Sequence, residues 1–231
     1  MNYNKQIIVS LDFSTEKSCL KFLQDMDPAR CRLKVGKELF TRCGPALIHK
    51  INTLGYDVFL DLKFHDIPNT VAEALKAAAD LGVWMVNVHA SGGKAMLDAS
   101  REALNFDEAP LLIGVTVLTS MGTEDLVQVA INNSPQEQVQ LLADLALNSG
   151  LDGVVCSAQE TAFLCSKFPN DFKFITPGIR PNGDHFDDQK RVVTPRLALD
   201  QGSDFLVIGR PITQASKPSD KLDSIIKELE S

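Results

Sequence analysis

The chain has 231 residues, of which 44% are hydrophobic and 23% are charged, and its formal net charge is −7. Because no linker, low-complexity tract or abrupt change of composition divides it, we expect a single domain over residues 1–231. The acidic balance and the lack of a Lys/Arg-rich run argue against nucleic acid and anionic membrane surfaces as partners.

The first residues, MNYNKQIIVSLDF, contain one apolar run that is broken by Ser10 and Asp12. This run is too short for a signal-peptide core or a membrane span, so we expect a cytoplasmic protein. The five cysteines are an odd number and include no Cys-x-x-Cys pair. Reduced thiols are therefore expected, rather than a disulfide framework or a thiolate zinc site.

Short apolar stretches alternate with helix-like segments along the chain. We expect eight strands, at residues 6–13, 31–36, 57–64, 85–90, 111–118, 153–158, 173–179 and 205–212. Strands that alternate with helices pair in parallel, because each return crossing needs a helix. Eight such units predict an α/β fold, the (β/α)8 TIM barrel. A doubly wound open sheet is the competing fold, but SLDFSTEKS after the first strand lacks the G-x-G-x-x-G turn.

Capping residues predict where several helices begin. Pro45 is expected at the start of one helix, since proline suits the first helical position. Thr70 and Glu73 have the spacing of a capping box before the helical stretch 71–82. Ser134 and Glu137 have the same spacing and predict a second capping box.

Charged residues interrupt the third predicted strand, in DVFLDLKFHDIPNT (57–70). Because side chains alternate along a strand, Phe59, Asp61 and Lys63 share one face and the aliphatic residues share the other. The aliphatic face should meet the helices, so Asp61 and Lys63 should point into the barrel near the carboxyl end of the strand. A structural salt bridge is one interpretation, but charges inside a small barrel are costly unless they are paired or used.

Neighbouring strands bring more charges to the same rim. Asp12 follows the first strand and Lys34 lies near the end of the second, so three consecutive strands supply two acids and two lysines. Oppositely charged neighbours hold one another ionised and in place. We therefore predict a functional charge cluster at the carboxyl ends of these strands.

Glycines and arginines follow the last two strands. TPGIRP contains Gly178 and Arg180, and VIGRPI contains Gly209 and Arg210. TIM barrels commonly bind phosphate here, because backbone N–H groups at glycines can approach the anion and an arginine fork matches its oxygens. The polar stretch 181–193 suits a lid over a bound phosphate, and a surface loop is the alternative.

The motifs SLDF, LKVG, DLKFHDIPNT, VTVLTS, TPGIRP and VIGRPI resemble, in order and approximate spacing, those of orotidine 5′-monophosphate decarboxylases. The resemblance implies a carboxy-lyase that converts orotidine 5′-monophosphate to uridine 5′-monophosphate in de novo pyrimidine biosynthesis, with no cofactor and no metal. It implies that Lys63 protonates C6 of the pyrimidine and that Asp61 lies against the substrate carboxylate. Lys34 and Asp12 would hold the ribose and order the charges.

The resemblance also implies further binding residues and a partner. Thr119 would contact the pyrimidine, with Ser120 as the alternative in that register. Asp66 and Thr70 would enter the site of a neighbouring subunit, and Asp66 would be one of the catalytic residues. The expected enzyme is therefore a homodimer. The residues that would bind the 5′-phosphate, or close the loop above it, are Arg180, Gln189, Gly209 and Arg210.

Three other functions stay open on the sequence. The D-x-K-x-x-D pattern that starts at Asp61 also resembles the Mg²⁺-dependent 3-keto-L-gulonate 6-phosphate decarboxylase, although Lys34 and the longer DLKFHDIPNT string argue against it. A metal-dependent sugar-phosphate epimerase would use His65, His89 and carboxylates as ligands. A barrel that binds a nucleotide without turning it over is the third alternative.

Overall fold

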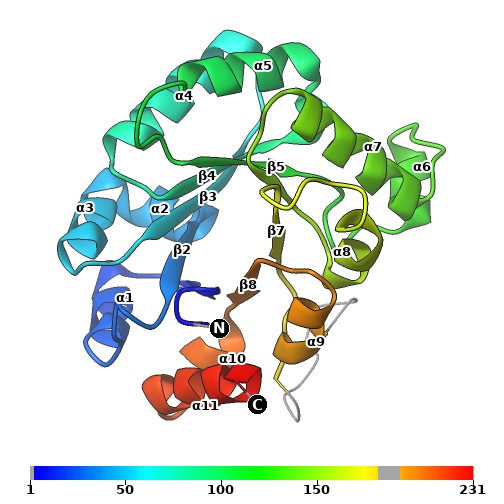
Figure 1. Ribbon diagram of the computed structural model, residues 1–231. Coiled ribbons are helices and arrows are strands. Elements are labelled where there is room, and N and C mark those ends of the chain that lie inside the picture. Colours follow the sequence, from blue (N-terminus) through cyan, green and yellow to red (C-terminus); the bar gives the residue numbers. More distant parts are fainter. Residues whose placement is uncertain (1–2, 182–192, 231) are drawn as a thin grey trace.

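The computed structural model describes residues 3–181 and 193–230. Its strands form a closed parallel barrel in chain order, in which the last strand pairs with the first. Figure 1 shows the strands at the centre with helices around them. The predicted (β/α)8 barrel is thereby confirmed. The strands are β1 (Ile7–Ser10), β2 (Arg32–Gly36), β3 (Val58–Phe64), β4 (Met85–His89), β5 (Leu111–Val115), β6 (Gly153–Val155), β7 (Lys173–Thr176) and β8 (Phe205–Ile208).

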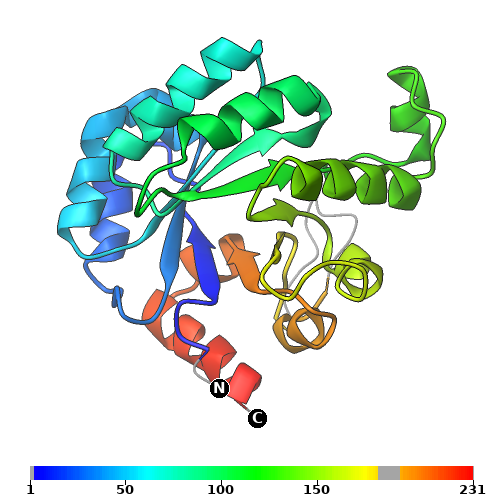
Figure 2. The same cartoon turned by 45° about the horizontal axis from the view of Figure 1, so that its top comes forward.

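The helices connect successive strands, and several connections contain two of them. Figures 1 and 2 both show α6 standing away from the barrel on the outside of the molecule. In the described residues, no helix combines the length and the apolar character that crossing a membrane requires. The helices are α1 (Glu16–Leu23), α2 (Lys37–Cys43), α3 (Pro45–Thr53), α4 (Pro68–Asp80), η1 (Ala90–Gly92), α5 (Lys94–Ala103), α6 (Thr123–Gln128), α7 (Pro135–Asn148), α8 (Ala158–Leu164), α9 (Pro195–Asp200), α10 (Arg210–Thr213) and α11 (Pro218–Glu230).

Two apolar layers lie on the two faces of the barrel wall. In β3, Val58 and Leu60 join the large cluster between strands and helices, whereas Phe59 joins a separate cluster inside the barrel. This alternation follows from the two-residue period of a strand and agrees with the prediction for β3. The inner cluster consists of Ile8, Phe59, Met85, Ile113, Ile175 and Val207.

Charged and aromatic side chains lie together at the amino-terminal end of the barrel. The Arg32 guanidinium lies 4.1 Å from the centre of the Trp84 ring, and its Nε is 3.2 Å from a carboxylate oxygen of Asp57. A guanidinium can stack on an aromatic ring and pair with a carboxylate at the same time. The opposite end, at the carboxyl ends of the strands, is where TIM barrels place their active sites.

One predicted helix start is wrong. The capping box at Thr70 and Glu73 does not form, because α4 already begins at Pro68 and Thr70 lies inside the helix. Proline suits the first helical position, where its missing N–H costs no hydrogen bond. The box at Ser134 and Glu137 is confirmed by reciprocal bonds between each side chain and the other residue's backbone N–H, and α3 begins at Pro45 as predicted.

Candidate active site

Asp61 lies in β3 between two lysine side chains. Its Oδ1 is 2.5 Å from Lys63 Nζ, and its Oδ2 is 3.1 Å from Lys34 Nζ of β2. The Asp61 residue is only 8% exposed. Both carboxylate oxygens are therefore occupied by ammonium groups at the carboxyl ends of adjacent strands, as the strand pattern predicts.

The surroundings of Asp61 favour its charged form. Burial alone would raise the pKa of this carboxyl, but the charges of Lys34 and Lys63, together with hydrogen bonds from Lys63 and Asn87, lower the pKa to about 2. Opposite charges and donated hydrogen bonds stabilise a carboxylate. Asp61 is thus a fixed negative charge at neutral pH.

The backbone at Lys63 departs from a regular strand. Its φ is +51°, a left-handed conformation that non-glycine residues rarely adopt. The Lys63 N–H donates to the side-chain oxygen of Asn87 at 2.8 Å, and the Asn87 amide donates to Asp61 Oδ1 at 2.7 Å. Asn87, in β4, was missed by the sequence reasoning; the only signal was a polar residue within the apolar stretch MVNVHA.

Asp12 lies just beyond β1, next to the same charges. The Ser10 hydroxyl donates to Asp12 Oδ1 at 2.9 Å. A side chain at Gly209 would place its Cβ 3.0 Å from Asp12 Oδ2, so the absence of a side chain there leaves room for this carboxylate. A hollow beside the barrel mouth is lined by Asp12 together with Lys34, Asp61 and Lys63, so the structure brings together the four charges predicted to cluster.

A mostly apolar pocket opens next to this charge cluster. Thr119 contributes to its lining, whereas Ser120 does not. Apolar walls with a few fixed polar groups are typical of sites for small flat ligands. Besides Thr119, the lining residues are Lys34, Phe59, Asp61, Lys63, Val115, Val117, Leu118, Val155, Cys156, Ile175, Pro177 and Val207.

The residues predicted to bind phosphate lie at the ends of β7 and β8, apart from one that the structure does not describe. Gly209 precedes α10, which begins at Arg210, at the carboxyl end of β8. Arg180 is buried after β7, and its guanidinium donates to the Ile179 carbonyl oxygen at 3.0 Å. Gln189 and most of the predicted lid, residues 182–192, lie outside the described residues.

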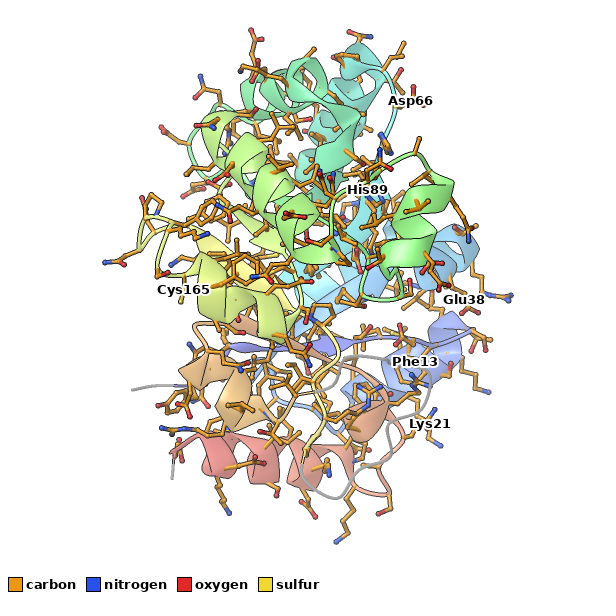
Figure 3. All side chains as sticks on the ribbon, turned by 90° about the vertical axis from the view of Figure 1, so that its right-hand side faces the viewer. Phe13, Lys21, Glu38, Asp66, His89 and Cys165 are labelled. Atoms are coloured by element: carbon orange, nitrogen blue, oxygen red, sulfur yellow. The ribbon has the colours of Figure 1, made fainter. Side chains whose placement is uncertain are left out.

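The segment after β3 is exposed. Residues 65–70, including Asp66 and Thr70, are all exposed. Asp66 Oδ1 accepts the N–H of Ile67 at 2.7 Å. Figure 3 shows Asp66 at the outer edge of the molecule, with His89 further in. The structure therefore does not bring Asp66 and Thr70 to the Asp61 carboxylate of their own barrel.

Two histidines lie beside the charge cluster. The rings of His65 and His89 are 5.3 Å apart between centres. Burial, followed by the charges of His65, Lys37 and Lys63, lowers the pKa of His89 to about 4. Across residues 3–181 and 193–230, no group of three or more His, Cys, Asp or Glu side chains is arranged to hold a metal ion.

Comparisons with known proteins agree with this geometry. Residues 5–225 match the model of the Orotidine 5'-phosphate decarboxylase / HUMPS family. Two proteins named orotidine 5'-phosphate decarboxylase are similar over nearly their whole length. The one from Saccharophagus degradans is 58% identical over 97% of this chain and 94% of its own, and the one from Vibrio parahaemolyticus is 56% identical over 99% of each.

A solved structure supports the same relationship. The crystal structure of orotidine 5'-phosphate decarboxylase from Lactobacillus acidophilus superposes with a TM-score of 0.88 at 39% sequence identity, and it covers 99% of this chain and 100% of its own. The family predicted from the motifs is confirmed, and the protein is a member of the Orotidine 5'-phosphate decarboxylase / HUMPS family.

Proposed function

We propose that this protein decarboxylates orotidine 5′-monophosphate to uridine 5′-monophosphate, the reaction of pyrimidine biosynthesis for which its relatives are named. Relatives at 55–58% identity carry the name orotidine 5'-phosphate decarboxylase, and the chain is accordingly a carboxy-lyase. The observation that carries the proposal is the Lys34–Asp61–Lys63 array beside an apolar pocket.

The difficulty of the reaction is the electron pair left at C6. When the C6–carboxylate bond breaks, CO2 departs and the pair stays on a ring carbon without an obvious acceptor. The Lys63 ammonium is the group suited to stabilise this carbanion, because a positioned cation in a water-poor site acts strongly on developing negative charge. Lys63 then gives its proton to C6 as a general acid.

Asp61 acts on the substrate before the bond breaks. A substrate carboxylate about 4 Å from the Asp61 carboxylate would be repelled by roughly 4 kcal/mol at an effective dielectric constant of about 20. This repulsion disappears as neutral CO2 leaves. The low pKa of Asp61, about 2, supports the role, since the carboxylate stays ionised while a second anion approaches.

Binding of the nucleotide is divided between the pocket and the rim. We assign the pyrimidine to the apolar walls and Thr119, and the ribose to Asp12 and Lys34. The 5′-phosphate is assigned to the last two strand ends, with Arg180, Gln189, Gly209 and Arg210. Binding energy from a phosphate remote from C6 can be used to orient and desolvate the reacting group.

The enzyme is further proposed to work as a homodimer that shares its sites. Asp66 and Thr70 belong to an exposed segment, and Ile67 between them is a large apolar side chain that is 67% exposed. We assign this segment to the contact with the second subunit, where Asp66 and Thr70 would enter the partner's site. The cytoplasmic location expected from the sequence stays a prediction.

An absorbance assay tests the proposed reaction. Orotidine 5′-monophosphate is mixed with the purified protein after treatment with EDTA, and the loss of substrate absorbance is followed while the product is identified by mass spectrometry. We expect complete conversion to uridine 5′-monophosphate without added metal. Activity that requires Mg²⁺, or turnover of 3-keto-L-gulonate 6-phosphate instead, would favour the rival decarboxylase. Binding without turnover would favour a non-catalytic barrel.

A further inference from the structure

Asn87 is a buried polar residue inside an otherwise apolar strand. It is 0% exposed, and its neighbours in β4 are Val86 and Val88. A buried amide is costly unless its donor and acceptor both find partners. Both of its known partners belong to the candidate active site: the side-chain oxygen accepts the Lys63 N–H, and the amide nitrogen donates to Asp61 Oδ1.

The pairing of β3 with β4 shifts around this side chain. Leu60 is opposite Val86 and Phe64 is opposite Val88, so three residues of β3, from Asp61 to Lys63, face only Asn87. The extra length is accommodated by the left-handed backbone at Lys63, with φ of +51°. Such a conformation persists only where the surroundings hold it in place, and irregular pairing of this kind can redirect a side chain at a functional site.

We propose that Asn87 is a positioning residue for the decarboxylation, which holds the Asp61 carboxylate and the Lys63 backbone at fixed positions relative to each other. The inference rests on the proposed function and adds to it a residue outside the charged cluster. An amide suits the task because it donates to a carboxylate and accepts from a backbone N–H at the same time. Aspartate lacks the donor, and an aliphatic residue lacks both groups.

Asp61 is surrounded by charged residues besides its partner Asn87, and a change at Asn87 leaves these residues in place. Lys34 of β2 and Lys63 of β3 act on this carboxylate, and Asp61 in turn acts on His89 of β4; all three residues remain in an Asn87 variant. Asn87→Ala adds no charge, so a difference in pH dependence between this variant and wild-type protein reports the lost amide. Asn87→Asp also places a new carboxylate near Asp61 and His89, and its pH profile therefore reports both changes.

Asn87→Asp and Asn87→Ala are compared with Ser100→Ala as the matched control. Ser100 is also 0% exposed, but its hydroxyl donates only to the backbone oxygen of Met96 in α5, at 2.7 Å. We expect kcat to fall by about 100-fold in both Asn87 variants, because small displacements of reacting groups cost that much. The Kd of uridine 5′-monophosphate should change far less, and Ser100→Ala should keep its kcat.

The pH profile separates positioning from a purely structural role. In Asn87→Asp, Asp61 loses one hydrogen bond and gains a neighbouring carboxylate, so the acid limb of kcat/KM should move up by about 1 pH unit or more. An unchanged kcat and acid limb in a folded Asn87→Asp would overturn the inference. So would failure of both variants to fold, judged by circular dichroism, while Ser100→Ala folds. An inactive wild-type protein would instead refute the proposed function, and this inference with it.

Discussion

Asp61 pairs with two lysines, each at a different carboxylate oxygen, and the two lysine side chains differ in exposure. Lys34 is 13% exposed at its side chain and balances one carboxylate oxygen from β2. Lys63 is 25% exposed at its side chain and bonds the other oxygen, and both lysines line the pocket. A substrate entering the pocket would therefore meet the more exposed of the two cations together with a carboxylate that cannot easily become neutral.

Lys63→Ala tests the proton donor. We expect loss of decarboxylation to below about a tenth of wild-type turnover, which corresponds to more than about 1.4 kcal/mol in the barrier, with the barrel still folded. Lys173→Ala is the control, because Lys173 is also a partly buried lysine, paired with Asp204 at 3.3 Å at the start of β7. Stopped-flow absorbance gives kcat, and turnover above this limit would show that Lys63 is not the acid.

Asp61→Asn tests the linkage between this site and folding. Because the folded-state pKa of Asp61 is lowered to about 2 from its ordinary value of 3.8, the ionised carboxylate stabilises the fold above pH 3.8. That stabilisation is lost as the pH falls from about 4 to about 2. We expect Asp61→Asn to lower the free energy of unfolding by roughly 2 kcal/mol at pH 7, and by about half as much at pH 3.

Urea denaturation at the two pH values measures this difference. Asp200→Asn is the control, since Asp200 forms an exposed pair with Arg196 one turn away on α9, and such pairs contribute little. A loss of stability for Asp61→Asn that is equal at pH 7 and pH 3 would contradict the assigned linkage.

At the scale of secondary-structure elements, the alternation of apolar stretches and helical segments predicted the barrel, but not the shift in strand pairing or the exact ends of the elements. The period of β3 correctly separated Val58 and Leu60 from Phe59. The register shift after Leu60 could not be predicted, because it is stabilised by Asn87, which is 24 residues from Lys63 in the sequence. One helix start was predicted too late: the expected cap at Thr70 lies inside α4, which already begins at Pro68.

Strand lengths show the same limit. The first strand was predicted at residues 6–13, whereas β1 ends at Ser10. Asp12 thereby leaves the strand and bonds the Ser10 hydroxyl. Apolar and charged residue types indicate which residues gather at the rim, but the hydrogen bonds between neighbouring strands decide where each strand stops. The four charges of the cluster could thus be predicted, while the bonds that orient them could not.

Arg210→Ala tests the element at the end of β8. Arg210 begins α10 directly after Gly209, at the rim assigned to the phosphate. We expect the variant to lose affinity for uridine 5′-monophosphate far more than for uridine, by 10-fold or more, since a hydrogen bond to a charged group contributes about 1.5–3 kcal/mol. Isothermal titration with both ligands measures this, and Arg196→Ala on exposed α9 is the control. Equal losses for nucleotide and nucleoside would place Arg210 outside the phosphate site.

At the scale of the whole molecule, the four charges of the cluster come from a single barrel, whereas the segment that follows β3 is exposed at its rim. Arg32, Trp84 and Asp57 lie together at the amino-terminal end of the barrel, opposite the rim that carries the charge cluster. On that rim, residues 65–70 are all exposed, and Asp66 and Thr70 line neither the pocket nor the hollow at Asp61. A two-fold dimer makes such a segment useful, because each chain can complete the other's site.

Subunit complementation tests the shared site. Lys63→Ala and Asp66→Asn chains are expected to be nearly inactive alone and to regain activity when they are unfolded and refolded together. If Asp66 enters the partner's site, one site of a mixed dimer carries both lesions and the other carries none. Random pairing makes about half of the dimers mixed, each with one intact site of two, so about a quarter of wild-type activity should return.

A second mixture supplies the control for this experiment. Lys63→Ala and Asp61→Asn change two residues that are in contact within one chain, at 2.5 Å. Every site of their mixed dimer then carries one lesion, so co-refolding should restore no activity. Native mass spectrometry shows in both cases that mixed dimers have formed. If neither mixture recovers although mixed dimers are present, each chain builds its site alone and Asp66 belongs to its own barrel; if both recover, the activity comes from something other than a shared site.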